Sequence, residues 1–145
     1  MNGYGVYTDV NGAVLEGYWK DDLQDGRCVE TLADGSKFEG QFVQGKKQGH
    51  GRLVWKDGST YEGHFENNQM HGRGVLTWAD GRRYEGDYLN DKMHGHGTYT
   101  WADGKQYEGP WENGKHHGEG IYRKPGCADR KGLWHEGKRV KWITE

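Results

Sequence analysis

The chain has 145 residues and a formal net charge of −2, and it contains 26 Gly, seven Trp, nine Tyr and three Phe. Aliphatic side chains are too few for the core of a compact two-layer globular domain, which is built mainly from Leu, Ile and Val. The many aromatic residues argue against a disordered chain, and the small net charge argues against nucleic-acid binding over the whole surface. We therefore expect an ordered protein with no nucleic-acid partner.

An aromatic-Glu-Gly motif recurs along almost the whole chain, and the step from Tyr84 to Tyr107 is 23 residues. The motif begins at Leu15, Phe38, Tyr61, Tyr84 and Tyr107, with a degenerate copy at Arg130. A second ring follows four residues later in each copy, at Trp19, Phe42, Phe65, Tyr88, Trp111 and Trp134. We interpret residues 1–145 as one repeat array. Its units are a partial repeat at 1–14, repeats at 15–37, 38–60, 61–83, 84–106 and 107–129, and a degenerate C-terminal repeat at 130–145.

Each repeat is predicted to form a β-hairpin. After Gly97, Tyr99 and Trp101 fall on one face of a strand, because successive side chains of a strand alternate between faces. Asp103-Gly104 then predicts a tight turn, since glycine readily adopts a positive φ, and Asn113-Gly114 predicts the loop to the next hairpin. Glycine at this density excludes helices, because each one costs about 1 kcal/mol relative to alanine.

The return strand carries Tyr107, Gly109 and Trp111 on one face and Glu108 on the other. A glycine between two rings leaves space that a neighbouring ring can fill. Glu108 and its equivalents are expected to accept backbone N–H bonds in the turn above them. Successive hairpins then pair edge to edge. This predicts an all-β fold, an elongated single-layer twisted antiparallel sheet of consecutive 23-residue hairpins.

The pattern changes at both ends of the chain. Near the C-terminus, Pro125 stands in the region where other repeats have Trp and Asp-Gly, so this hairpin should differ in shape or lie at an edge. At the N-terminus, Met1 enters in the middle of a repeat, and we expect a fragment of a longer array.

Two cysteines, Cys28 and Cys127, lie far apart in such an array. This separation predicts reduced thiols and an intracellular protein. No apolar run reaches the roughly 18 residues of a membrane span, which favours a soluble, cytoplasmic chain.

These repeated motifs resemble the MORN repeat (membrane occupation and recognition nexus), with Tyr-Glu-Gly, Gly-x-Gly and Asp-Gly recurring in register. The resemblance implies a β-hairpin array that acts as a scaffold or adaptor at the cytoskeleton or at the inner face of a membrane. Residues 137–143 look most like the C-terminal repeats of protozoan cytoskeletal MORN scaffolds, which are similar in forming homodimers. The resemblance also implies cytoskeletal proteins as partners. A regulatory segment beside the catalytic domain of a larger enzyme is an alternative.

No catalytic residue is predicted, and we expect the chain not to be an enzyme. Each Gly-x-Gly motif is predicted to open a strand, whereas a phosphate-binding loop leads into a helix N-terminus. The serines Ser36 and Ser59 follow Asp-Gly turns, where a short polar residue is expected for structural reasons. The Glu that recurs in every repeat is interpreted in the same way, as structural.

No cofactor or metal site is predicted in a single chain. His71, His94 and His117 recur one repeat apart, at roughly 10 Å, which is too far for one zinc ion with bonds of about 2 Å. Cys127, Asp129 and His135 suit zinc by chemistry, and a two-fold interface could double their number. Zinc at a dimer interface is therefore one hypothesis for these residues, and an ordinary buried thiol at Cys127 is the other.

Positive charge gathers after Ile121, where seven cations stand against three carboxylates, a net charge of +4. The cations are Arg123, Lys124, Arg130, Lys131, Lys138, Arg139 and Lys141. Such a cluster can bind an acidic phospholipid surface, including phosphoinositides, at about 1 kcal/mol per residue. The alternative interpretation is a solvated terminus.

The leading hypothesis is a non-enzymatic scaffold that forms a homodimer through its C-terminal repeats. A final strand with apolar side chains exposes unpaired backbone groups beside apolar area, and a two-fold partner would cover both. The candidate interface residues are Leu133, Trp134, Val140, Trp142 and Ile143.

Overall fold

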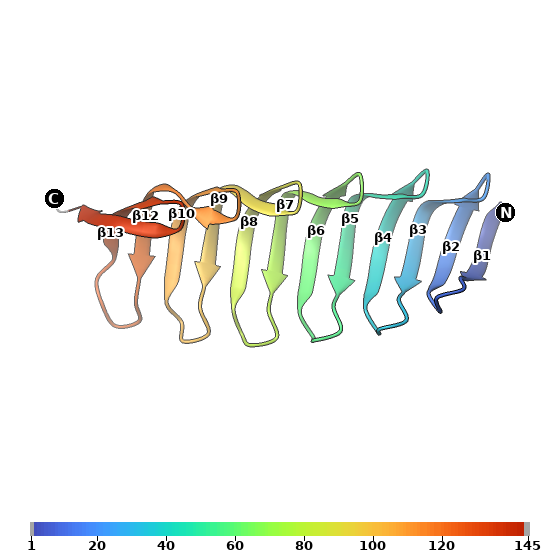
Figure 1. The fold of residues 1–145 in the computed structure, drawn as a ribbon, viewed down its shortest axis with the longest axis horizontal. Helices are drawn as coiled ribbons and strands as arrows, with labels where there is room; N and C mark the ends of the chain where they lie inside the picture. Colours follow the sequence, from blue (N-terminus) through green and yellow to red (C-terminus); the bar gives the residue numbers. More distant parts are fainter. Residues whose placement is uncertain (1, 144–145) are drawn as a thin grey trace. The chain divides into compact units, whose positions relative to one another are not determined.

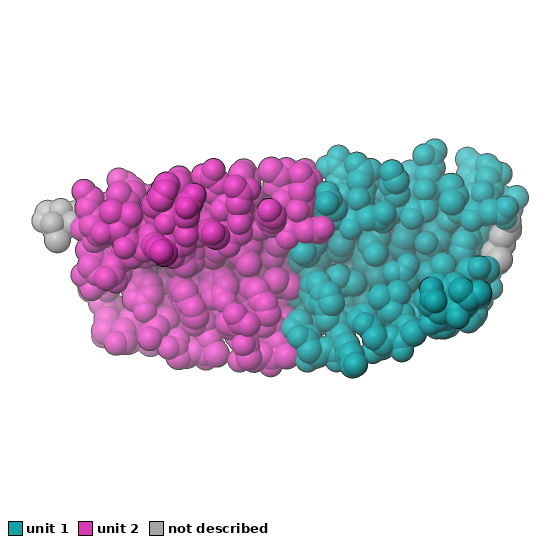
Figure 2. Space-filling model, in the orientation of Figure 1, with its two compact units in different colours: residues 1–70 teal, residues 71–145 magenta. Residues whose placement is uncertain are grey.

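The computed structural model describes residues 2–143, which form fourteen β-strands and no helix. The chain divides into two compact units, residues 1–70 and 71–145 (Figure 2). The described residues include no helix long and apolar enough to cross a membrane.

The first unit contains six complete strands in chain order (Figure 1). They are β1 (Gly3–Thr8), β2 (Val14–Lys20), β3 (Leu23–Thr31), β4 (Lys37–Val43), β5 (Lys46–Val54) and β6 (Thr60–Glu66). Each strand pairs antiparallel with the next, from β1 with β2 to β5 with β6.

Strand β7 (Gln69–Thr77) begins at the end of the first unit, and most of it belongs to the second. The second unit continues with β8 (Arg83–Leu89), β9 (Lys92–Thr100), β10 (Gln106–Glu112), β11 (Lys115–His116), β12 (Gly118–Arg123), β13 (Arg130–His135) and β14 (Lys138–Ile143). Pairing is again antiparallel between chain neighbours, and β10 pairs with both β11 and β12. The predicted all-β antiparallel array of hairpins is confirmed.

Two kinds of turn join the strands, and both follow from the predicted motifs. Asn113 and Gly114 both have positive φ, 52° and 81°, which gives a two-residue turn whose twist matches its strands. The Asp-Gly turns have three-residue loops: Trp101 N–H donates to Lys105 O at 2.8 Å across the loop, and Gly104 has a φ of 93°. The Asp103 carboxylate stabilises this loop by accepting the Lys105 N–H at 3.0 Å.

The strands that carry Gly-x-Gly are longer than predicted. Strand β9 begins at Lys92, so Gly95 and Gly97 lie inside it, and Trp101 lies in the turn beyond it. The pairing of β8 with β9 shifts register between Gly86 and Tyr88. Gly95 has a φ of 74°, and a β-bulge commonly places a glycine at such a positive φ. The first glycine therefore serves a bulge within a strand, and the prediction that the motif opens the strand was wrong.

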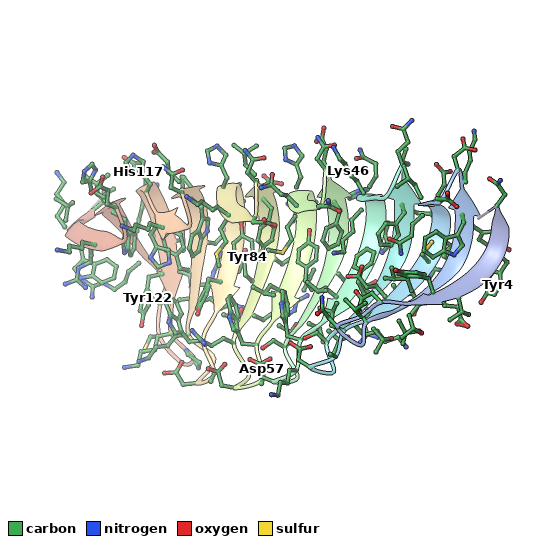
Figure 3. All side chains as sticks on the ribbon, turned by 45° about the vertical axis from the view of Figure 1, so that its right-hand side comes forward. Tyr4, Lys46, Asp57, Tyr84, His117 and Tyr122 are labelled. Carbon is green, nitrogen blue, oxygen red and sulfur yellow. The ribbon has the colours of Figure 1, made fainter. Side chains whose placement is uncertain are left out.

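One face of each unit carries the buried rings, and we call it the ring face. Tyr84 is 0 % exposed and lies across Gly97, where a Cβ would be only 2.3 Å from the Tyr84 Oη (Figure 3). The same ring contacts Tyr88 and Trp111 edge-on, at centroid distances of 5.2 and 5.3 Å. The ring therefore lies in space left by Gly97, the second glycine of the Gly-x-Gly motif. At Gly86, the glycine between Tyr84 and Tyr88, a Cβ would instead meet the Gly97 backbone and the Tyr84 hydroxyl of its own strand.

The opposite face carries pairs of acidic and basic side chains on neighbouring strands. Arg27 contacts Glu39 at 2.8 Å, and His96 lies 3.5 Å from Glu108. The Glu of the repeated motif therefore faces a basic side chain, not the backbone N–H groups that were predicted. Because these pairs are exposed, each contributes about 0–1 kcal/mol.

Candidate functional site

The last two strands of the second unit rest on a stack of rings. Trp134 in β13 is 7 % exposed and contacts Tyr107 edge-on, with ring centroids 4.8 Å apart. His116 stacks on Tyr107 at 4.0 Å, and burial lowers the pKa of His116 to about 4. The same loss of water raises the pKa of Tyr107 to about 12. Both groups are therefore neutral near pH 7, and β13 is anchored on an uncharged core.

Trp142 in β14 lies at the end of this ring stack, and the guanidinium groups of two arginines lie over its ring. Its ring centroid is 6.0 Å from that of Trp134 and 5.9 Å from that of Tyr122. The Cζ atoms of Arg130 and Arg139 lie 3.7 and 4.5 Å from the Trp142 centroid. Stacking of this kind contributes about 0.5–1 kcal/mol at exposed sites and holds both cations in place.

Three lysines lie on the other face of β13 and β14. Gly132 pairs with Trp142 on the ring face, so alternation places Leu133 and its partner Lys141 on the opposite face. The pairs Lys131 with Ile143 and His135 with Lys138 share that opposite face. The side chains of Lys131, Lys138 and Lys141 are exposed. Within residues 2–143 none of the three forms an ion pair, and neither does Arg130 or Arg139.

We refer to these exposed cations together with Trp142 as the basic end surface. Its members are Arg130, Lys131, Lys138, Arg139, Lys141 and Trp142.

Arg123 differs from the other cations of the C-terminal cluster. Its guanidinium contacts Glu108 at 2.7 Å and Asp129 at 3.2 Å. The hydrogen bond from Arg123 lowers the pKa of Glu108, and the same bond raises the pKa of Arg123. Arg123 is therefore neutralised within the chain, whereas Lys124 is exposed and forms no ion pair in the described part.

The family model of the MORN repeat matches residues 1–14, 16–37, 38–60, 61–82, 84–106 and 107–126. The chain belongs to the MORN-repeat family. A comparison with curated proteins found no match. The last of the six matches ends at residue 126, before the basic end surface.

MORN-repeat proteins are generally non-enzymatic repeat modules, and the family is consistent with a role at a membrane or in a scaffold. The positions that recur in every MORN repeat of this chain are buried rings, glycines and turn residues, which build the fold. The basic end surface lies outside the matched repeats and is therefore the better candidate for recognition of a partner.

The five candidate dimer residues are not gathered into one patch. Trp134 is buried, and Trp142 is partly covered by arginines on the same face. Leu133 and Ile143 lie on the opposite face. Val140 is 59 % exposed at the bulge where the β13–β14 register shifts.

The metal candidates are also separated. Cys127 is an exposed free thiol, so the prediction of a buried thiol was wrong: the residue lies in the exposed turn between β12 and β13. Asp129 contacts Arg123. His135 lies beside His117, at a centroid distance of 5.3 Å. Within residues 2–143, no group of three or more His, Cys, Asp and Glu residues could hold a metal ion.

The structure brings together residues that the sequence prediction treated separately. His117 and His135 line a polar cavity of about 580 Å³ with Glu112, and His117 Nε2 lies 3.3 Å from a Glu112 carboxylate oxygen. Figure 3 shows His117 at one end of the strands and Tyr122 toward the other.

The sequence prediction also missed the stacking of Arg130 and Arg139 on Trp142. Arg139 and Trp142 are three residues apart, so simple alternation along a strand would put them on opposite faces. The β-bulge in the β13–β14 pairing brings them to the same face, and the sequence pattern does not show this bulge.

Proposed function

We propose that this MORN-repeat chain is a scaffold module that attaches to acidic phospholipid surfaces through its basic end surface. The observation that carries the proposal is a group of five exposed cations on two adjacent strands, none with a carboxylate partner in the described chain. Lysine and arginine near an acidic leaflet contribute about 1 kcal/mol each. Trp142 adds a ring of the kind that favours the membrane–water interface.

The distribution of charge supports a partner that is acidic. Three of the six residues in β14 are cations, and a lysine-rich final strand discourages pairing with a like-charged strand. An anionic surface, in contrast, gains from the three lysines that share one face of β13 and β14. The proposal places the protein at the inner face of a membrane, in the cytoplasm, with cytoskeletal proteins as further partners of the array.

The test is flotation of the full chain with phosphatidylcholine vesicles that contain phosphatidylserine or phosphatidylinositol 4,5-bisphosphate. We expect binding to the acidic vesicles and a reduction of about a hundredfold when Lys131, Lys138 and Lys141 are all changed to Gln, since three contributions of about 1 kcal/mol are lost. The matched control changes Lys20, Lys37 and Lys46, which are exposed cations of the first unit, to Gln. Equal binding by both triple variants, or no binding by the parent at about 150 mM salt, would refute the proposal.

A homodimer through β14 is a second proposal, supported by a different observation. Among the described residues β14 pairs only with β13, so its outer edge has backbone groups outside the ladder, next to the exposed Val140. Two copies joined across this edge bring like charges together, and self-association should therefore strengthen with salt. Light scattering at tens of micromolar protein tests this. A monomer at both low and high salt excludes the dimer, and a Trp142→Asp variant that dimerises like the parent excludes β14 as its interface.

A further inference from the structure

A second row of aromatic side chains lies on the ring face of the second unit, and we call it the outer ring row. Its members are Trp78, Tyr99, Trp101, Tyr122 and Trp142. Neighbouring members contact each other along the whole row, with centroid distances of 5.4, 4.8, 6.2 and 5.9 Å in that order. Tyr99 and Tyr122 both pair with the buried Tyr107, which places the row on the ring face.

The outer ring row is only partly covered by the chain. Tyr99 is buried, whereas the other four rings of the row are half-buried. Their indole groups also differ from that of Trp111, an inner ring whose N–H donates to the Gly97 carbonyl at 3.2 Å. Within residues 2–143 the indole N–H groups of Trp78 and Trp101 donate to no acceptor of the chain. The row therefore offers a ligand both apolar area and hydrogen-bond donors.

The fold does not require aromatic side chains at these positions. Trp78 and Trp101 form the backbone hydrogen bond that closes their Asp-Gly loops, each at 2.8 Å. Leu32 and Asp9 form the same bond at the equivalent positions of earlier repeats, at 2.8 and 2.9 Å. The position of the two tyrosines is held by Leu53 in an earlier repeat. Since other side chains serve these positions, the exposed rings of the second unit are better explained by recognition of a partner.

The spacing of the row fits one kind of peptide. Trp78 and Trp101 are one repeat apart, and a repeat of two strands advances the sheet by roughly 10 Å. Their centroid distances to Tyr99, 5.4 and 4.8 Å, agree with this spacing. A polyproline II helix has about three residues per turn and rises about 3.1 Å per residue, so one side of it recurs about every 9 Å. A peptide in this conformation, laid across the strands, places every third residue on a ring.

Proline suits the row in shape and in hydrogen bonding. A polyproline II segment is ordered before it binds, and it has no internal hydrogen bonds, so its carbonyl groups are free to accept the indole N–H groups of Trp78 and Trp101. Aromatic surfaces bind such segments by packing rings against the prolines. The row supplies both the rings and the donors.

The ring face becomes basic at the end of the row. The guanidinium groups of Arg130 and Arg139 lie 3.7 and 4.5 Å from the Trp142 centroid. Neither arginine forms an ion pair in the described part of the chain. An acidic residue beside the prolines would therefore meet two unpaired cations at this end.

We propose that the outer ring row is a docking surface for a proline-rich segment of a partner protein. The segment would adopt the polyproline II conformation, with a proline at every third residue and an acidic residue next to them. The row lies on the ring face, whereas Lys131, Lys138 and Lys141 lie on the opposite face. The proposal therefore goes beyond attachment to phospholipid and does not depend on it.

The test is a titration of the full chain with the peptide acetyl-Glu-Pro-Ala-Ala-Pro-Ala-Ala-Pro-Glu-amide, followed by NMR at the indole N–H signals of Trp78 and Trp101. We expect saturable shifts of both signals, with a Kd on the order of 1 mM or tighter. The peptide carries Glu at both ends, so it presents a carboxylate to Arg130 and Arg139 in either direction along the row.

Two control peptides test the spacing and the charge. The first, acetyl-Glu-Pro-Ala-Pro-Ala-Pro-Ala-Ala-Glu-amide, has the same composition, but its prolines fall on different sides of the helix. It should bind about fivefold more weakly or worse, because one proline at most then faces the row. The second has Lys in place of both Glu residues and should also bind more weakly. Equal binding of the two Glu peptides, or equal or tighter binding of the Lys peptide, overturns the proposal.

Two variants copy side chains that earlier repeats carry at equivalent positions, so both should fold. Trp101→Leu copies Leu32, and Tyr122→Leu copies Leu53. We expect Trp101→Leu to weaken binding of the Glu peptide by about tenfold, because aromatic anchors dominate such interfaces, and Tyr122→Leu to weaken it by several-fold. Circular dichroism verifies folding, and parental affinity in either folded variant overturns the proposal.

The matched control variant removes an exposed ring from the other face of the first unit. Tyr18 is 53 % exposed and pairs with Tyr4 on that face, and Tyr18→Gln copies Gln41 at the equivalent position of the next repeat. This variant should bind the Glu peptide like the parent. A loss equal to that of Trp101→Leu would show that the peptide binds exposed rings without selection, and it would also overturn the proposal.

Discussion

The contact between Tyr84 and Gly97 allows a sharp test of how these repeats are packed. The Tyr84 ring is fully buried, and a Cβ on Gly97 would lie 2.3 Å from its Oη and 2.5 Å from its Cε2. The same two positions hold Leu15 and Cys28 in the first complete repeat. A smaller side chain on one strand thus accompanies a larger one on the next. We therefore predict that Tyr84→Leu and Gly97→Cys are each harmful alone and partly compensate each other.

The size of each effect follows from the structure. Tyr84→Leu removes most of a buried ring and its 2.9 Å hydrogen bond to the Asp87 carbonyl, which should cost about 2–3 kcal/mol. Gly97→Cys forces atoms into the ring and should cost about 3 kcal/mol. In the double variant the space left by the ring receives the thiol, so the total cost should fall short of the sum by about 2 kcal/mol.

The assay is urea unfolding of the parent, the two single variants and the double variant, with the slope of the transition checked for constancy. The control pairs Tyr84→Leu with Gly120→Cys, since Gly120 lies against Tyr107 and not against Tyr84. That pair should be additive. If the costs of Tyr84→Leu and Gly97→Cys add to within about 0.5 kcal/mol, the compensation argued from Leu15 and Cys28 does not exist.

Two further predictions concern titration and thiol reactivity. Because burial lowers the folded-state pKa of His116 to about 4, the folded state binds fewer protons than the unfolded state below pH 6.5, and stability should fall as the pH drops from about 6.5 toward 4. His116 is partly exposed, so the loss should be about 1–2 kcal/mol, and His116→Met, which copies Met93 of the previous repeat, should remove this pH dependence in urea unfolding. Cys127 is exposed, whereas Cys28 is buried and burial raises its pKa, so a thiol reagent should modify one cysteine of the native chain quickly and the second only on unfolding. Fast modification of both thiols, or of a Cys127→Ser variant, would contradict the burial of Cys28.

The sequence predicts the hairpins well, because their determinants are local and repeated. Asp103-Gly104 and Asn113-Gly114 specify turns within a few residues, and the alternation of Tyr107, Gly109 and Trp111 specifies the ring face. Each copy of the motif supports the others, so errors in one repeat do not change the result. The fold class follows from these signals alone.

Other features depend on contacts between strands, which a single repeat does not encode. The bulge near Gly86 lengthens β9 and places Gly95 inside it, and the repeat gives no sign of this register shift. Glu108 meets His96 and Arg123 from two neighbouring strands, and a second bulge brings Arg139 to the face of Trp142. Those contacts could not be read from spacing, because a bulge reverses the alternation on which the prediction rests.

Comparing the repeats of one chain shows where a repeat departs from the common pattern. It also shows whether another residue of the chain compensates for that departure. Cys28 departs from the glycine of other repeats, yet its thiol satisfies the Tyr18 carbonyl, so this departure needs no partner. Two other departures are not compensated in this way. The described chain supplies no acceptor for the Gln24 side-chain amide. It also supplies no carboxylate partners for the cations of the basic end surface. An anionic surface is the partner that we propose for these cations.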